Sequence, residues 1–311
     1  MSLGSAVRSL VSRRLDPATL ERLKIVRRCL ADLRDSYRPV ARGADRGTVG
    51  IADIRAALVD MGIRSGDVVH VHSSASHLVA GTQSIRLAGG VVRTLIDLVG
   101  ETGTLLMNTD AVRDGWDHAL SREVFDYATW PSHRGLISEV FRRRRDVVRS
   151  VHPWYNVTAW GRRAVELVGE HHRSSPYAMD EHSPWYKLNQ VDGKVLLLGN
   201  GYRHNSLVHL AEYLYPDEFP RPVFLSRPVV MRYTTWERQV ADMPVMLHAH
   251  VWKHSAEARF AEYLQAKYGF YQVRHLASGA SLVCYRASDQ LEAILREMKQ
   301  DITWYDLRFG A

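Results

Sequence analysis

The hydrophobic residues of this chain follow two repeating patterns. Short, nearly all-apolar runs bounded by polar turns are typical of strands covered on both faces, and apolar residues at intervals of three and four are typical of helices. In the first part of the chain the runs predict strands over Asp67–His72, Gly103–Thr109, Tyr155–Trp160 and Gly193–Gly199. The helical pattern predicts helices over Ile51–Met61, Leu87–Val99, His133–Arg145, Arg162–Glu170 and Asn205–Leu214. This alternation predicts α/β architecture.

From about Arg221 onward the pattern changes to strand-like segments interleaved with helices. The strand-like segments are Val229–Tyr233, Val245–His250, Gln272–His275 and Ser281–Tyr285, and the helices are Ala256–Tyr268 and Asp289–Lys299. No glycine- or proline-rich linker divides this part from the first. We therefore predict that residues 50–311 form a single domain, a three-layer α/β/α fold with a mixed, largely parallel central sheet.

Residues 1–49 differ from the rest in charge. They carry 11 Lys or Arg against 5 Asp or Glu, whereas residues 50–311 carry 30 against 29. Asp16 and Pro17 suit the N-cap and first residue of a helix, and an apolar stripe follows, made of Leu23, Val26, Leu30 and Leu33. We predict a basic helical arm and linker. Its apolar stripe would pack on the body or on a second copy of the chain, giving a homo-oligomer; attraction of its basic face to an anionic membrane or polymer is the alternative.

Composition narrows the class of protein. Hydrophobic residues make up 46% and charged residues 24% of the 311 positions, as in ordinary globular domains. No apolar run reaches the ~18 residues of a membrane span, and the basic arm is not accompanied by a recognised nucleic-acid-binding module. Cys29 and Cys284 each lie in an apolar run, which favours two buried thiols over a disulfide. We expect a cytoplasmic protein with no nucleic-acid partner and no transmembrane segment.

One candidate site is a turn of small residues after the first strand. The strand ending at His72 runs into Ser73, Ser74, Ala75 and Ser76. Such a turn can present backbone N–H groups and hydroxyls to a phosphate. The glycine spacings of a dinucleotide fingerprint and of a Walker loop are absent. Taken alone, the segment suits an ordinary serine-rich turn equally well.

A second candidate site follows the strand over Gly193–Gly199. A polar turn leads from this strand into a helix that carries His209 and Glu212. Residues three apart share one face of a helix, so both side chains can point at a ligand beyond the carboxyl end of the strand. A hydrogen-bonded pair that secures the helix in the core is the structural alternative.

The order of these motifs resembles the aminoglycoside 3-N-acetyltransferase family, antibiotic acetyltransferases that are distinct from the small GNAT acetyltransferases. The resemblance covers about residues 50–215 collinearly. The matching residues are Gly66-Asp67 with His72-Ser73-Ser74, Gly103-Thr104-Leu105, Pro131-Ser132 with Gly135, Phe141-Arg142-Arg143 through Arg149-Ser150 and His152-Pro153, Ala159 and Gly161, Ser183-Pro184 with Lys187-Leu188, Gly193 to Gly199, and Asn205, His209 and Glu212. The resemblance implies the antibiotic-acetyltransferase α/β/α fold and an N-acetyltransferase that uses acetyl-CoA. By position it assigns Ser73, Ser74, Ala75 and Ser76 to the pyrophosphate and pantetheine of acetyl-CoA, with His72 at the edge of that cleft.

Transfer to an amine also needs a general base, because a sugar amine is mostly protonated near neutral pH and must be neutral to attack a thioester. In the family, a histidine that follows an acid, some ten residues before a Ser-Pro pair, resembles this base. The chain offers Glu170, His171 and His172 there. We favour His171, with His172 as the alternative and an exposed loop position as the structural interpretation of both. His209 and Glu212 would then orient the base or the amine. No histidine cluster has the spacing of a metal site, so no metal is expected.

The expected acceptor is a small-molecule amine, an amino sugar or an aminoglycoside-like compound. Polycationic aminoglycosides call for an acidic cleft, whereas residues 50–311 are nearly neutral. The acceptor side is instead rich in aromatic residues, namely Trp116, Tyr155, Tyr177, Trp185 and Tyr186. This favours a less cationic amino sugar. A non-catalytic CoA-binding or assembly protein of the same fold is the rival hypothesis.

Overall fold

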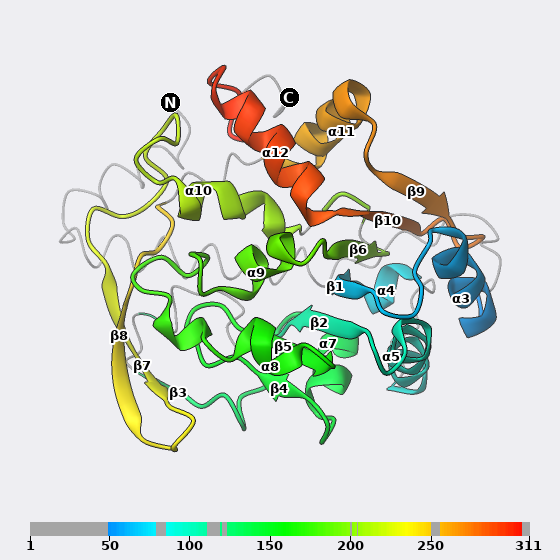
Figure 1. Ribbon diagram of the computed structural model, residues 1–311, viewed down its shortest axis with the longest axis horizontal. Coiled ribbons are helices and arrows are strands. Elements are labelled where there is room, and N and C mark those ends of the chain that lie inside the picture. Colours follow the sequence, from blue (N-terminus) through cyan, green and yellow to red (C-terminus); the bar gives the residue numbers. More distant parts are fainter. Residues whose placement is uncertain are drawn as a thin grey trace, which may run out of the picture. The chain divides into compact units, whose positions relative to one another are not determined.

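The central feature of the computed structural model is a seven-stranded sheet with the order β4-β5-β2-β1-β6-β10-β9 (Figure 1). The structure describes residues 49–78, 85–110, 119, 123–199, 201–203, 205–249 and 256–306. The strands of the sheet are β1 (Val68–Ser73), β2 (Thr104–Asn108), β4 (Val148–Arg149), β5 (Val157–Gly161), β6 (Lys194–Leu198), β9 (Gln272–His275) and β10 (Ser281–Arg286). The four strands predicted in the first part of the chain are confirmed, with small shifts at their ends.

Within the seven-stranded sheet, parallel pairing is confined to the three central strands. β1 pairs in parallel with both β2 and β6, whereas β5, β4, β10 and β9 are joined by antiparallel pairs. The predicted mixed sheet is confirmed, and its parallel part is the centre. Because β1, β2 and β6 run in the same direction, their last residues Ser73, Asn108 and Leu198 meet at one edge of the sheet. In α/β folds this carboxyl edge is where ligands bind.

Helices cover both faces of the sheet, as predicted for three layers. Alternate residues of β6 show the division: Leu196 and Leu198 belong to one buried apolar cluster, and Val195 and Leu197 to the other. The first cluster includes helices α3 (Ile51–Asp60), α5 (Ile85–Val99) and α7 (Leu136–Arg142). The second includes α8 (Ala164–Val168), α9 (Pro184–Gln190), α10 (Leu210–Leu214), α11 (Glu257–Tyr268) and α12 (Ala287–Met298). The short helix α4 (Ala75–Leu78) follows β1.

A separate three-stranded sheet stands apart from the central one at one side of the molecule (Figure 1). It consists of β3 (Val124–Phe125), β7 (Val229–Thr234) and β8 (Val240–Val245). The predicted strand over 245–250 is wrong, because β8 ends at Val245, opposite Val229. Past Val245 the carbonyl of Leu247 accepts a hydrogen bond from the N–H of Leu225 at 2.8 Å, and the pairing with β7 does not continue. His248 makes an isolated bridge with Phe224 instead.

Residues 1–48, which hold almost all of the predicted basic arm and Cys29, lie outside the described residues. The arm, its role in oligomerisation and the cytoplasmic location therefore stay predictions. Cys284 is a buried free thiol, and burial raises its pKa to about 11. Across the part of the chain that the structure describes, no helix has the length and apolar character needed to cross a membrane.

Candidate active site

The serine turn predicted to bind the cofactor lies at the carboxyl edge of the sheet. The N–H of Ser74 donates to the carbonyl of Leu198 at 2.9 Å, which ties the turn to the end of β6. Gly199 follows with a φ of 87°, and a Cβ there would stand 2.9 Å from the carbonyl oxygen of Ser74. Only glycine allows the two loops to approach this closely. The Ser73 hydroxyl has no hydrogen-bond partner among the described residues.

The neighbouring residues of the turn are less open. His72 is buried in β1, with its ring 4.7 Å from the ring of His70 in an edge-to-face contact. Ala75 is buried at the start of α4, the short helix that also contains Ser76. The turn thus places the buried Ser73 hydroxyl and backbone groups at the edge where three parallel strands end, while the Ser74 hydroxyl lies 2.6 Å from His77 Nδ1. Binding of the pyrophosphate or pantetheine of acetyl-CoA by this turn stays a prediction.

Polar side chains connect this edge to the segment that carries His209. His70 Nε2 lies 2.8 Å from Asn108 Oδ1, and Asn108 Nδ2 donates to Ser206 Oγ at 2.9 Å. Burial lowers the pKa of His70 to about 4, so the ring stays neutral near pH 7. The residues from Ser206 to His209 form one 3-10 turn that continues into α10. The predicted helix in this region is present, and its first turn is wound more tightly than an α-helix.

Glu212 is the centre of a buried polar cluster. Its side chain is 0% exposed. Oε1 accepts hydrogen bonds from His209 Nδ1 and the Tyr305 hydroxyl, each at 3.0 Å, and Oε2 accepts one from His248 Nε2. The other nitrogen of His248 lies 3.3 Å from the Tyr213 hydroxyl. Burial alone would raise the pKa of Glu212, but the two imidazoles outweigh it and lower that pKa below its ordinary value.

The second ring nitrogen of His209 faces a different carboxylate. Nε2 lies 3.3 Å from Oε1 of Glu257, the first residue of α11, and the two side chains are 15% and 25% exposed. Trp304 packs edge-on against the imidazole, with ring centroids 5.8 Å apart. Burial disfavours the imidazolium, but Glu212 and Glu257 outweigh it and raise the pKa of His209 above its ordinary 6.5. His209 therefore has one nitrogen held in the core and the other on a partly open side.

The same cluster has the donor types of a metal site. His209, Glu212 and His248 offer ligand atoms that all lie within 4.8 Å of one another. Two imidazoles and a carboxylate form a donor set that zinc accepts. However, all four ring nitrogens of the two histidines already have polar partners in the protein. Hydrogen bonds alone account for the arrangement.

His171, the favoured base of the sequence analysis, lies in the core. Its Nδ1 is 3.0 Å from Ser150 Oγ and its Nε2 is 2.9 Å from the carbonyl of Ala178. The ring stacks on His152 at 4.6 Å and is 0% exposed. Burial lowers the pKa of His171 to about 3. A ring with both nitrogens occupied and no exposed surface has no position from which to take a proton from a substrate.

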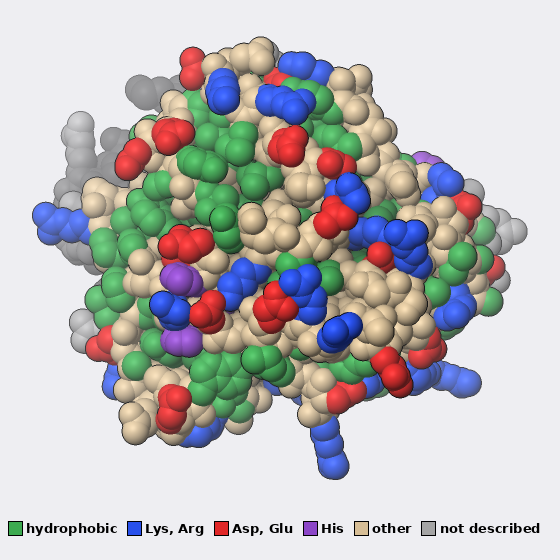
Figure 2. Space-filling view, in the orientation of Figure 1, with side chains coloured by type: hydrophobic (Ala, Val, Ile, Leu, Met, Phe, Trp, Pro, Cys, Tyr) green, Lys and Arg blue, Asp and Glu red, His purple; other side chains and the backbone are tan. Residues whose placement is uncertain are grey.

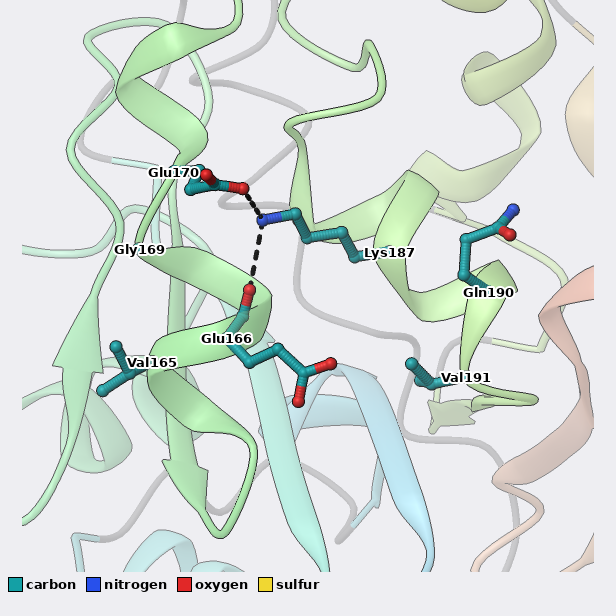
Figure 3. Close-up of a pocket in the computed structure, with 7 residues that line it drawn as sticks. All are labelled: Val165, Glu166, Gly169, Glu170, Lys187, Gln190 and Val191. Atoms are coloured by element: carbon teal, nitrogen blue, oxygen red, sulfur yellow. Dashed lines mark hydrogen bonds and ion pairs between the residues drawn. The ribbon is translucent and has the colours of Figure 1, made fainter.

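Glu170 and His172 lie beside α8, near the surface. Glu170 pairs with Lys187 Nζ at 2.7 Å, and His172 Nδ1 lies 3.1 Å from the carbonyl of Gly169. Glu170 and Lys187 line a hollow of about 610 Å³ beside α8 and α9, and Figure 3 shows their ion pair. The acid that precedes the two histidines thus serves a surface ion pair. The structure does not bring His171, His172 and His209 together into one site.

Two of the predicted acceptor-side aromatic residues lie next to the Glu212 cluster. Tyr155 and Tyr177 both make edge-to-face contacts with Tyr213, at 6.2 and 6.4 Å. Trp185 instead packs against His171, at 5.4 Å, and Trp116 lies outside the described residues. On the face shown in Figure 2, acidic and basic side chains are interspersed.

Comparisons with known proteins identify the family of the chain. The family model described as aminoglycoside 3-N-acetyltransferase matches residues 69–298, and the chain belongs to this family. It is 29% identical over 222 residues to aminoglycoside N(3)-acetyltransferase IX of Micromonospora chalcea, an alignment that covers 63% of this chain and 73% of the relative.

Solved structures show the same fold. AAC-IIIb in a binary complex with CoASH superposes with a TM-score of 0.66 at 21% identity, covering 85% of this chain and 99% of the other. A histidine-to-alanine variant of AAC(3)-IVa in complex with a gentamicin superposes with a TM-score of 0.65 at 23% identity, covering 83% and 92%. The predictions of an antibiotic-acetyltransferase fold and of an enzyme of this family are confirmed.

Proposed function

We propose that this protein transfers the acetyl group of acetyl-CoA to an amine of an amino sugar or aminoglycoside, with His209 as the general base. The observation that carries the proposal is the pairing of His209 with Glu212. Glu212 holds Nδ1, which fixes the orientation of the ring, while Nε2 lies on the partly open side. Family membership supports the reaction, and the burial of His171 favours His209 over it as the base.

Each residue of the site would have a separate role in the reaction. Ser73 and Ser74 would bind the donor through hydroxyl and backbone groups, and His209 Nε2 would take a proton from the amine. Glu212 would stabilise the resulting imidazolium, as a carboxylate does when it holds the second nitrogen of a catalytic histidine. When bound, acetyl-CoA supplies an acetyl thioester whose carbonyl carbon accepts the amine nitrogen while its C–S bond breaks.

The electrostatics of the free enzyme predict its pH dependence. The two carboxylates raise the pKa of His209 above 6.5, so the ring is largely protonated at neutral pH. A base must be unprotonated to act. We therefore expect kcat/KM to rise with pH through and beyond neutrality.

The test compares His209→Asn with His171→Asn, using acetyl-CoA with gentamicin, sisomicin and D-glucosamine as acceptors and following thiol release. Loss of the base should lower kcat by ~10²–10⁴-fold in His209→Asn, while CoA binding, measured by calorimetry, persists. His171→Asn should unfold at a lower temperature, because it disturbs two buried hydrogen bonds, yet keep near-normal kcat while folded.

The opposite pattern, an active His209→Asn and an inactive but folded His171→Asn, would contradict the assignment. CoA binding without transfer by the unaltered protein to any of the three acceptors would favour the non-catalytic rival. The acceptor panel also tests our proposal of a less cationic acceptor, which requires D-glucosamine to be used at least as efficiently as gentamicin.

A further inference from the structure

Glu257 occupies the side of His209 from which an acceptor would approach. Its Oε1 is 3.3 Å from His209 Nε2, the nitrogen that a base would use, and its side chain is 25% exposed. Glu212, by contrast, is fully buried and its oxygens accept hydrogen bonds from His209, His248 and Tyr305. Of these two carboxylates beside the imidazole, Glu257 is the one that solvent and solutes reach.

The position of Glu257 is fixed by the fold. It is the first residue of α11, and the N–H of the preceding Ala256 donates to the carbonyl of Trp304 at 2.8 Å. Phe260, one turn further on, packs against Trp304 with ring centroids 5.7 Å apart. Trp304 in turn contacts the ring of His209. The start of α11 and the imidazole are thus held against the same tryptophan.

An acceptor amine reaches the enzyme mostly as an ammonium ion. A carboxylate at hydrogen-bond distance from the base is the group that would receive this ion and place its N–H beside the base. In the structure, the imidazolium of His209 is the cationic partner of Glu257. The arriving ammonium and the imidazolium then compete for one carboxylate.

We propose that Glu257 binds the ammonium group of the acceptor and delivers it to His209, so that substrate binding itself prepares the base. This inference rests on the proposed role of His209. As the ammonium pairs with Glu257, the nearby positive charge makes the imidazolium release its proton to solvent. His209 Nε2 then takes one proton from the ammonium. The neutral amine nitrogen forms its C–N bond as the thioester C–S bond breaks, and the second amine proton leaves with the sulfur as CoA thiol.

Four groups among the described residues contact His209 and bear on its titration. Glu212 lies on its own helical segment, His248 follows β8, Glu257 begins α11, and Trp304 precedes Tyr305 in the C-terminal segment. Of the two carboxylates, only Glu257 would change partner when an acceptor binds. Its removal should therefore affect both acceptor binding and the pH profile of the free enzyme.

The experiment compares Glu257→Gln with Glu262→Gln, a control at an exposed position on the same helix. We expect the KM for gentamicin to rise about tenfold to a hundredfold in Glu257→Gln, as for loss of a hydrogen bond to a charged group. The KM for acetyl-CoA should stay unchanged. The acid limb of the kcat/KM profile should move to lower pH, because one of the carboxylates that favour the imidazolium is gone. Glu262→Gln should match the unaltered enzyme in all three measurements.

An unchanged KM for gentamicin together with an unmoved acid limb in folded Glu257→Gln would overturn the inference. Thermal unfolding of each variant confirms that it is folded. The two hypotheses fail differently: an active His209→Asn refutes the proposed base, whereas an inactive His209→Asn with an unaffected Glu257→Gln refutes only the role of Glu257.

Discussion

Tyr305→Phe isolates the support that the C-terminal segment gives to the proposed catalytic pair. The Tyr305 hydroxyl donates to Glu212 Oε1 at 3.0 Å, and the tyrosine is 3% exposed. Phenylalanine keeps the ring that packs beside Trp304 and Phe219. The substitution therefore removes one of three donors to a buried carboxylate and little else.

The size of the effect follows from the burial of both partners. A hydrogen bond to a charged group contributes about 1.5–3 kcal/mol. Because His209 and His248 still bind the carboxylate, we expect a loss of about 1.5 kcal/mol in the free energy of unfolding. For a domain of this size that corresponds to a fall in Tm of about 3–6 °C.

The pH profile should move as well. The tyrosine hydroxyl stabilises ionised Glu212 and shares its charge, so removing it raises the pKa of Glu212. That carboxyl still ionises far below neutral pH, since its pKa starts below the ordinary value. Glu212 then favours the imidazolium more strongly and the pKa of His209, already raised, rises further. The acid limb of kcat/KM should shift to higher pH, opposite to the shift expected for Glu257→Gln.

Differential scanning calorimetry and kcat/KM measured from pH 6 to 9.5 test both effects. An unchanged acid limb with a normal Tm would refute the reasoning, since it would mean that Tyr305 does not act on Glu212. A lower Tm with an unchanged acid limb of kcat/KM would mean that Tyr305 contributes to stability only.

Two further predictions concern the scaffold. Burial acts to raise the pKa of Glu139, but hydrogen bonds, of which that from Arg142 is the strongest, lower this pKa from 4.5 to about 2. The ionised carboxylate therefore stabilises the fold above pH 4.5, and this contribution is lost as pH falls towards 2. Glu139→Gln should therefore show a Tm that depends less on pH between 5.5 and 2.5, and a parallel pH dependence would contradict this. Gly161 has a φ of 103°, and a Cβ there would lie 2.2 Å from the carbonyl oxygen of Gly103, so Gly161→Ala should lose about 2–5 kcal/mol in urea unfolding. Gly201→Ala, with a φ of 56° and no described atom within 4 Å, should lose only about 1–2 kcal/mol, and equal losses would show that close packing at Gly161 is unimportant.

The central sheet was predictable from the sequence because its strands are buried on both faces. β6 reads as the apolar run Val195 to Leu198 bounded by Lys194 and Gly199, and such a run has few other interpretations. The strand β8 was misplaced because Met243, Val245 and Leu247 continue the same alternation past its end. Past that end, Leu247 pairs with Leu225 instead of with β7, and pairing partners are not visible in a single strand's pattern.

The site was predictable only where it is local. His209 and Glu212 are three residues apart, so helical geometry alone places them together. His248 and Tyr305 meet Glu212 from 36 and 93 residues away, and no short-range pattern in the sequence connects them. His171 was favoured by its spacing from a Ser-Pro pair. Spacing does not reveal that both of its nitrogens are bonded inside the core.

The contact between Tyr305 and Glu212 also bears on how the enzyme acquires activity as it folds. Contacts between residues distant in sequence carry a larger entropic cost of loop closure and tend to form late. During synthesis, the segment with His209 leaves the ribosome well before Tyr305 is made. The segment that carries the proposed base is therefore available to fold before the residue that affects the pKa of His209 through Glu212. Recovery of secondary structure on refolding should therefore run ahead of recovery of turnover, and the gap between the two measures how long the C-terminal segment takes to dock.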